Sequence, residues 1–227
     1  MAFTFVQENN SSGLLKSAPW SVKYSSAVSA GNLLWALAAH GSLPSQISTV
    51  SDSQGNTWVQ VQRVVSSLRA CDLWYARAEV SGTNTVTIGS TSAPTMVGQI
   101  AEVSGFAQAI SVHALSSGAV SNSTTVHSLA SLTTDLPTAY LLGVCQVENG
   151  FTATANSSFT GRAPNGGGFY TEDQSASSTK TTNGTFTTAA SPALAVGFLV
   201  AFVSATVNNA GGQTWQVASC GSVGIGV

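Results

Sequence analysis

Few side chains in this sequence are suited to acid–base catalysis. Its 227 residues include nine acids and three histidines. A glycoside hydrolase needs two carboxylates facing each other across a cleft, about 5–10 Å apart. Glu102 is the leading candidate because it interrupts an apolar strand pattern, as Asp72 and Glu148 also do. Acids on a strand with one solvated face also simply point to solvent, and we favour that interpretation.

Other patterns of catalysis or metal binding are missing from the sequence. His40, His113 and His127 lack the spacing of a helical metal site, and no Gly-x-Ser-x-Gly elbow marks a nucleophilic serine. The segment Asp52–Asn56 offers oxygen ligands for calcium, but a tight turn accounts for the same residues. The sequence therefore predicts no metal site, no cofactor and no catalytic residue.

Ligand binding has a better candidate, in a segment that combines aromatic and acidic residues. Within 153–185, which we expect to be a long loop, a glycine-rich stretch precedes Phe169 and Tyr170. Loops on a rigid β scaffold often carry binding sites, although a solvated loop with a hydrophobic anchor explains the same residues. The candidate binding residues, for a sugar or a protein partner, are Trp58, Trp74, Phe169, Tyr170, Glu172 and Asp173.

Strands must position these side chains. Apolar and polar residues alternate in Phe3–Gln7 and Trp20–Tyr24, whereas 33–39 is an almost continuous apolar run. Such a run indicates a strand buried on both faces. Asp52–Asn56 is a turn, with Gly55 or Asn56 at positive φ, and predicts a hairpin whose returning strand begins at Trp58.

These patterns predict an all-β, jelly-roll-like antiparallel β-sandwich. We expect one domain over 1–207, followed by a glycine-rich strand or tail over 208–227. The length also suits two small sandwiches that share a core. A loose internal similarity places a turn before a long apolar strand three times, in 27–39, 134–147 and 191–203.

The scarcity of charge limits the possible partners. Charged residues make up 7% of the chain, against about 25% in an average soluble domain. The net charge is −2 and the basic residues are scattered, so we expect no nucleic-acid partner. The longest apolar run, 193–205, is too short to span a bilayer, and the first residues do not resemble a signal peptide. Three widely spaced cysteines, Cys71, Cys145 and Cys220, make no disulfide framework.

Several short motifs occur in a recognisable order: AGNLLW (30–35), SDSQGNTW (51–58), LWYA (73–76), NTVTI (84–88) and AEVSG (101–105). This order resembles a β-domain of tailed-phage virion proteins and of bacterial secreted or surface proteins. The resemblance covers about 25–106 and continues faintly over 133–144. It implies a jelly-roll or lectin-like sandwich, and it carries no catalytic residue with it.

The sequence thus predicts a protein that presents a surface. A composition typical of exposed proteins, without an export signal, favours a non-enzymatic structural or decoration protein of a phage virion, in the capsid or the tail. Its partners would be other virion proteins and further copies of itself, assembled in the host cytoplasm. The alternative is an extracellular carbohydrate-binding or adhesive module that recognises cell-surface glycans. A glycoside hydrolase using Glu102 with Asp72 or Glu172 ranks third.

Overall fold

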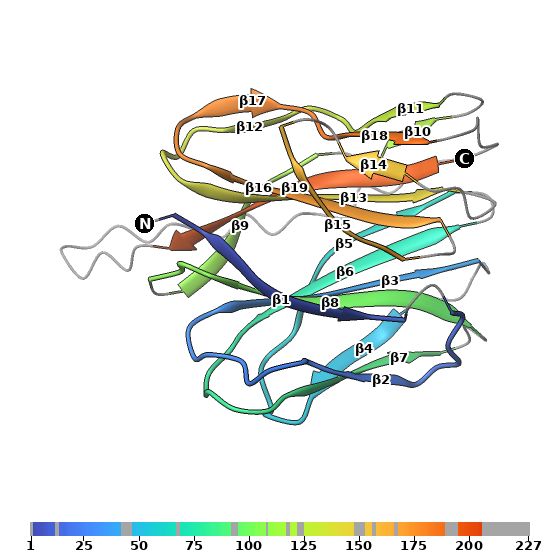
Figure 1. Cartoon of the computed structure of the whole chain (residues 1–227), viewed down its shortest axis with the longest axis vertical. Coiled ribbons are helices and arrows are strands. Elements are labelled where there is room, and N and C mark those ends of the chain that lie inside the picture. The colour runs from blue at the N-terminus through green and yellow to red at the C-terminus, as the bar shows by residue number, and fades with distance from the viewer. Residues whose placement is uncertain are drawn as a thin grey trace, which may run out of the picture.

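Figure 1 shows the structure, a computed structural model, in which the described residues form strands, turns and loops. The described ranges are 2–11, 14–41, 47–66, 69–91, 95–107, 109–116, 119–121, 125–147, 153–155, 158–165, 168–188 and 195–205. All strand pairs within the sheets are antiparallel. The predicted all-β antiparallel sandwich is therefore confirmed.

The first half of the chain forms two sheets. The first inner sheet has the strand order β1-β8-β3-β6-β5, and the first outer sheet has the order β2-β7-β4. The bounds are β1 (Thr4–Asn10), β2 (Trp20–Lys23), β3 (Leu33–His40), β4 (Ile47–Asp52), β5 (Val59–Val65), β6 (Ala70–Arg77), β7 (Thr85–Ser90) and β8 (Met96–Ser104).

The second half repeats this plan. The second inner sheet has the order β10-β19-β13-β16-β15, with β9 also pairing β19, and the second outer layer contains β11-β18-β14 and the pair β12-β17. The bounds are β9 (Ala109–Leu115), β10 (Ala119–Ser121), β11 (Val126–Ser128), β12 (Leu132–Thr134), β13 (Ala139–Val147), β14 (Ala153–Ala155), β15 (Thr160–Asn165), β16 (Phe169–Ala176), β17 (Lys180–Thr182), β18 (Thr185–Thr188) and β19 (Ala195–Ala205).

The sheets stack in four layers, with the two inner sheets in the middle (Figure 1). Each interface between layers holds its own apolar cluster. Leu34, Ala36 and Ala38 of β3 face the first outer sheet, whereas Leu33, Trp35 and Leu37 face the second inner sheet. This double burial explains the continuous apolar run, and it confirms the prediction for 33–39. The third cluster lies between the second inner sheet and its outer layer.

The two halves share one topology. The first inner sheet, β1-β8-β3-β6-β5, matches β9-β19-β13-β16-β15, and the first outer sheet, β2-β7-β4, matches β11-β18-β14. Gly98 in β8 and Gly197 in β19 anchor the correspondence, because they pair with Ala38 of β3 and Cys145 of β13 respectively. The chain is therefore two similar sandwiches that share a third interface. Of the three segments in the loose sequence similarity, 27–39 and 134–147 hold the equivalent strands β3 and β13. The third, 191–203, holds most of β19, whose counterpart is β8, so the duplication accounts for two of the three.

The Asp52–Asn56 turn is present, but the predicted hairpin is wrong. Gly55 has a φ of 74°, as the turn requires. The strands on either side belong to different sheets, because β4 pairs with β7 and β5 pairs with β6. The turn therefore carries the chain from the first outer sheet to the first inner sheet. The sequence around it predicted the turn correctly but not which strands its flanking strands pair with.

The long loop expected over 153–185 is also wrong. This segment contains β14, β15, β16 and β17, and β16 is a buried strand of the second inner sheet. Its polar composition concealed the strands, since β16 carries Thr171, Glu172 and Asp173 into the interior. The tail expected over 208–227 lies outside the described residues.

Candidate ligand-binding site

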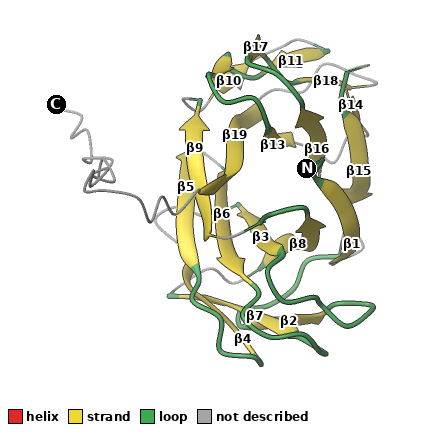
Figure 2. Cartoon of the chain, turned by 90° about the vertical axis from the view of Figure 1, so that its left-hand side faces the viewer, coloured by secondary structure: helices red, strands yellow, loops and turns green. Residues whose placement is uncertain are grey.

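The two inner sheets meet along two seams. At the first seam β1 lies against β15 and β16; at the second, β5 and β6 meet β9 and β19 (Figure 2). The shared topology makes the seams equivalent, because β1 corresponds to β9 and β15 to β5. The two seams therefore have the same arrangement of strands but different side chains.

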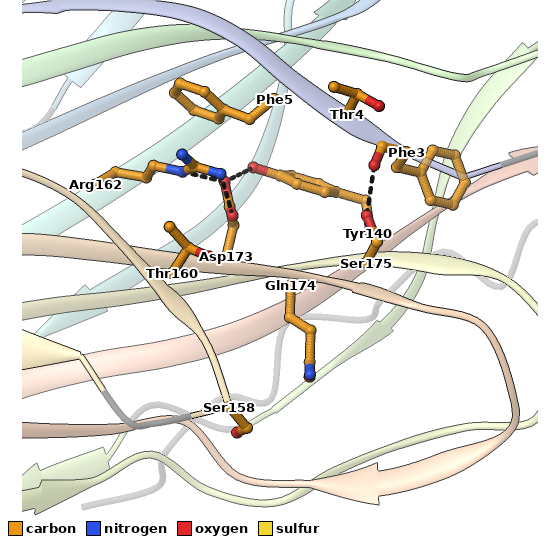
Figure 3. Close-up of a pocket in the computed structure, with 10 residues that line it drawn as sticks. All are labelled: Phe3, Thr4, Phe5, Tyr140, Ser158, Thr160, Arg162, Asp173, Gln174 and Ser175. Carbon is orange, nitrogen blue, oxygen red and sulfur yellow. Dashed lines mark hydrogen bonds and ion pairs between the residues drawn. The ribbon is translucent and has the colours of Figure 1, made fainter.

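An ion pair occupies the first seam (Figure 3). Arg162 of β15 donates from Nε and Nη2 to the two carboxylate oxygens of Asp173 in β16, at 2.7 Å each. The hydroxyl of Tyr140 donates to Asp173 Oδ2 at 2.8 Å. The guanidinium carbon lies 3.8 Å from the ring centroid of Phe5 in β1, a cation–π contact. Strands from both halves thus converge on one charged pair.

The surroundings keep these groups in defined protonation states. Burial, together with the charge of Asp173, raises the pKa of Tyr140 well above its ordinary value, so the phenol keeps its proton and donates. Burial opposes the charge of Arg162, but the hydrogen bonds and charge of Asp173 raise its pKa overall. The side chain of Asp173 is 5% exposed and that of Arg162 is 23% exposed. The phenol and the guanidinium therefore both keep their protons, and the pair is largely buried but open on the arginine side.

A cavity of about 330 Å³ adjoins this pair. It is lined by hydroxyl, amide and aromatic side chains from both halves, and Figure 3 shows them around the ion pair. The lining includes Phe3, Thr4, Ser158, Thr160, Gln174 and Ser175. Ser175 Oγ donates to the carbonyl of Phe3 at 2.6 Å, which ties β1 to β16. The volume is at the lower end of that of ligand pockets, which suits a small ligand.

Of the six predicted binding residues, only Asp173 lines this cavity. Phe169 and Tyr170 are buried in β16, where they contribute to two different apolar clusters. Trp58 and Trp74 are partly buried against the apolar cluster between the first outer sheet and the first inner sheet. The structure therefore separates the residues that the sequence grouped together.

Glu172 lies apart from the cavity as well. It is buried next to the second outer layer, where the absence of a side chain at Gly143 makes room for it: a Cβ there would lie 2.9 Å from Glu172 Cγ. Sequence reasoning missed Arg162, Tyr140 and Phe5. One property of the sequence could have drawn attention to Arg162, namely that the chain has only seven basic residues.

Glu102 is fully buried and fully engaged. Its carboxylate accepts hydrogen bonds from Gln7 Nε2 at 2.6 Å, from the Ser29 backbone amide at 2.8 Å and from Asn32 Nδ2 at 2.6 Å. It therefore ties β1 and the 25–32 loop to β8. The expectation that strand acids point to solvent is wrong for Glu102 and Asp72, because the inner sheet has a second layer on its other face. Glu148 lies outside the described residues.

Asp52 stabilises the turn that it begins. It accepts hydrogen bonds from Asn56, Trp58 Nε1 and Asn84 Nδ2, and from the backbone amide of Gln54. Burial alone raises the pKa of Asp52, but these hydrogen bonds outweigh it and leave the pKa below its ordinary value. The carboxylate oxygens of Asp52, which a calcium ion would need as ligands, thus already accept hydrogen bonds from these protein donors.

His40 and Asp72 form a buried pair at the end of β3 and β6. The separation of His40 Nε2 and Asp72 Oδ2 is 3.3 Å, and Gln60 Nε2 donates to the other carboxylate oxygen at 2.9 Å. His40 Nδ1 has no hydrogen-bond partner among the described residues. His113 instead pairs with Asp135, and His127 lies 3.4 Å from Thr188 Oγ1. The three histidines thus belong to three separate places in the fold.

The two described cysteines are free and buried. Cys71 packs between the inner sheets, and Cys145 packs on the opposite face of the second inner sheet. Burial raises the pKa values of both thiols well above the ordinary value for cysteine. Cys220 lies outside the described residues. Both described thiols therefore behave as small apolar side chains.

Over the described ranges, no three potential metal ligands cluster together, and there is no apolar helix of membrane-spanning length. No family model, curated protein or solved structure matches this chain. The fold and the first seam therefore carry the functional argument.

Proposed function

We propose that this chain is a non-enzymatic structural protein that presents a rigid β surface within a larger assembly, and that this assembly is a phage virion. One observation carries the proposal: the acids that interrupt the strands hold the scaffold together. Glu102 and Asp72 each accept hydrogen bonds from neighbouring strands or loops. Carboxylates committed in this way are poor general acids and bases.

The position of the acids also opposes hydrolysis. Glu102 pairs opposite Leu34 of β3, and Asp72 opposite Ala38. Four residues along a strand span about 13 Å, and the two acids lie on opposite sides of β3. This exceeds the separation that either glycosidase mechanism uses. Glu172 lies in the second sandwich, on the far side of the shared interface. A hydrolase based on these acids therefore has no geometric support.

Two features favour a structural role in a virion. The nested pairs β1–β8, β2–β7 and β3–β6 are those of a rolled hairpin, and β9–β19, β11–β18 and β13–β16 repeat them, which supports a jelly-roll assignment for each half. The motifs within 25–106 resemble domains of tailed-phage virion proteins.

We propose that β5 provides the contact between copies. It is an edge strand of the first inner sheet, and Val65 at its end is 43% exposed. An exposed edge with apolar side chains is a template for pairing with another chain. The charge-poor surface offers little repulsion between copies, since the net charge is −2.

Light scattering coupled to size exclusion tests this contact. We expect the wild-type chain to run as an oligomer and Val65→Lys to shift it toward monomer, because the charge would be placed at the paired edge. Val80→Lys is the matched control, since Val80 is 52% exposed but lies outside the strands. A wild-type chain that stays monomeric at all concentrations would contradict the assembly proposal.

The virion itself is tested separately. Gold-labelled antibodies against the chain should decorate purified phage particles from its source, at regular positions on the capsid or tail. Particles that contain no trace of the chain by mass spectrometry would overturn this part of the proposal. Surface stacking on glycans has less support, because Phe169 and Tyr170 are buried rather than displayed.

A further inference from the structure

The second seam serves as an internal control for the first. Strand registers make Tyr140 equivalent to Leu33, Asp173 to Tyr75, and Thr160 to Val59. Arg162 corresponds to Gln62, beside a bulge in β5 from which Val61 packs against the shared interior. At the second seam Leu33 lies in the shared apolar cluster, and Tyr75 packs against this cluster with its ring 5.4 Å from that of Phe202.

The polarity of the first seam extends beyond the ion pair. Thr171 Oγ1 donates to Gln99 Oε1 at 2.9 Å between the inner sheets, and Gln99 Nε2 donates to Glu8. The equivalent residues at the second seam are Leu73, Phe198 and Leu115, all apolar. Thr171, Gln99 and Glu8 thus each have an apolar counterpart in the other half.

This difference is not needed for folding. The fold closes the second seam with apolar side chains, and replacing a buried ion pair by apolar residues is often neutral or stabilising. Buried polar groups that the scaffold does not require indicate a site that serves another purpose. The cavity of about 330 Å³ lies beside these groups.

We infer that the first seam binds a small neutral saccharide or polyol. The charge of Arg162 is balanced by Asp173, and Glu8 adds a second negative charge nearby, so a phosphate or carboxylate ligand is disfavoured. The cavity is lined by hydroxyl and amide groups that suit a ligand rich in hydroxyls. The guanidinium and the Asp173 carboxylate supply a donor and an acceptor side by side, as vicinal hydroxyls require.

The aromatic rings indicate the size of the ligand. The face of Phe5 is covered by Arg162, and Phe3 packs against Phe106 with ring centroids 4.5 Å apart. These two contacts occupy ring surface at the cavity and leave less of it for stacking along a polysaccharide. Hydrogen bonding within a cavity of this volume fits one or two sugar rings. This site is independent of the proposed assembly role, and either can fail without the other.

Saturation-transfer NMR and calorimetry with the full chain test the site. The probes are glucose, galactose, mannose, N-acetylglucosamine, lactose and glycerol, with inorganic phosphate and acetate as anionic comparisons. We expect at least one neutral probe to bind with a Kd of about 1 mM or lower. Absence of binding by every neutral probe at tens of millimolar would overturn the inference, as would tighter binding of phosphate or acetate at this site.

Two variants locate the binding. Thr160→Phe places a ring at the mouth of the cavity from an exposed strand position, and we expect at least a tenfold loss of affinity (Figure 3). Val59→Phe makes the same change at the equivalent position of the second seam and should leave affinity within twofold. Arg162→Met with Asp173→Leu should abolish binding while the chain stays folded by circular dichroism. Binding that survives Thr160→Phe unchanged would place the ligand elsewhere and contradict the assignment.

Discussion

Gly98 in β8 and Gly197 in β19 hold the same position in the two halves of the molecule. A Cβ on Gly98 would collide with the carbonyl oxygen of Leu37, and a Cβ on Gly197 with that of Val144. Leu37 and Val144 are themselves equivalent residues of the central strands β3 and β13. The duplication thus preserves a close approach between backbones, and not only an order of strands.

Replacing either glycine by alanine should destabilise the fold. At both positions the obstruction includes backbone, which cannot move aside as a side chain does, together with a side chain, Trp20 at Gly98 and Leu129 at Gly197. We therefore expect Gly98→Ala and Gly197→Ala each to lower the free energy of unfolding by about 1–3 kcal/mol or more. Urea denaturation measures the change. Gly161→Ala is the control, since Gly161 is exposed and the nearest obstruction is the Ala155 side chain at 3.3 Å. Equal, small effects at all three positions would contradict the equivalence.

Glu102→Gln should also destabilise the chain. The new amide would direct a donor at Gln7, Ser29 or Asn32, each of which already donates to the carboxylate. We expect a loss of about 2–4 kcal/mol, because a buried acceptor of charged hydrogen bonds is removed and a donor is left opposed. Glu79→Gln is the matched control, with a side chain that is 63% exposed, and should change stability by less than about 0.5 kcal/mol. A similar midpoint for both variants would show that Glu102 is not a structural acceptor.

Asp52 should make stability depend on pH in the acid range. Its folded-state pKa is lowered, so the unfolded chain takes up the proton first as the pH falls. The stabilisation is therefore complete above about pH 4 and is lost as the pH falls through the folded-state pKa. Urea midpoints at pH 7, 4 and 2.5 should show the wild type and Asp52→Asn converging on acidification. A gap that stays constant over this range would rule out the carboxylate as the cause.

Replacing both residues of the first-seam ion pair should change the stability of the chain little, whereas replacing only one of them should lower it. Asp173→Leu alone leaves Arg162 without its counter-ion, and we expect a loss of about 3 kcal/mol. Adding Arg162→Met should recover most of this loss, because the seam then resembles its apolar counterpart. Thermal melts of the two variants and the wild type measure the difference. A double variant no more stable than Asp173→Leu would mean that the pair is required for folding.

Much of the local structure was predictable from the sequence. The continuous apolar run 33–39 indicated a strand with both faces buried, because only such a strand tolerates apolar residues at every position. The Asp52–Asn56 turn was equally clear, since an aspartate that accepts from residues two and four positions on needs no tertiary partner. These signals are local, and the fold retains them.

The binding site could not be predicted in the same way. Its members, Phe5, Tyr140, Arg162 and Asp173, come from four strands and both halves. The sequence pattern did not reveal strand β16, because the partners of its inward polar residues are distant in the pattern. Thr171 bonds Gln99 of the other inner sheet, and Asp173 bonds Arg162 of the neighbouring strand β15. The sequence by itself determined strands, turns and an all-β class through local patterns. The tertiary structure alone decided which sheet each strand joins, and so that one of two equivalent seams is polar.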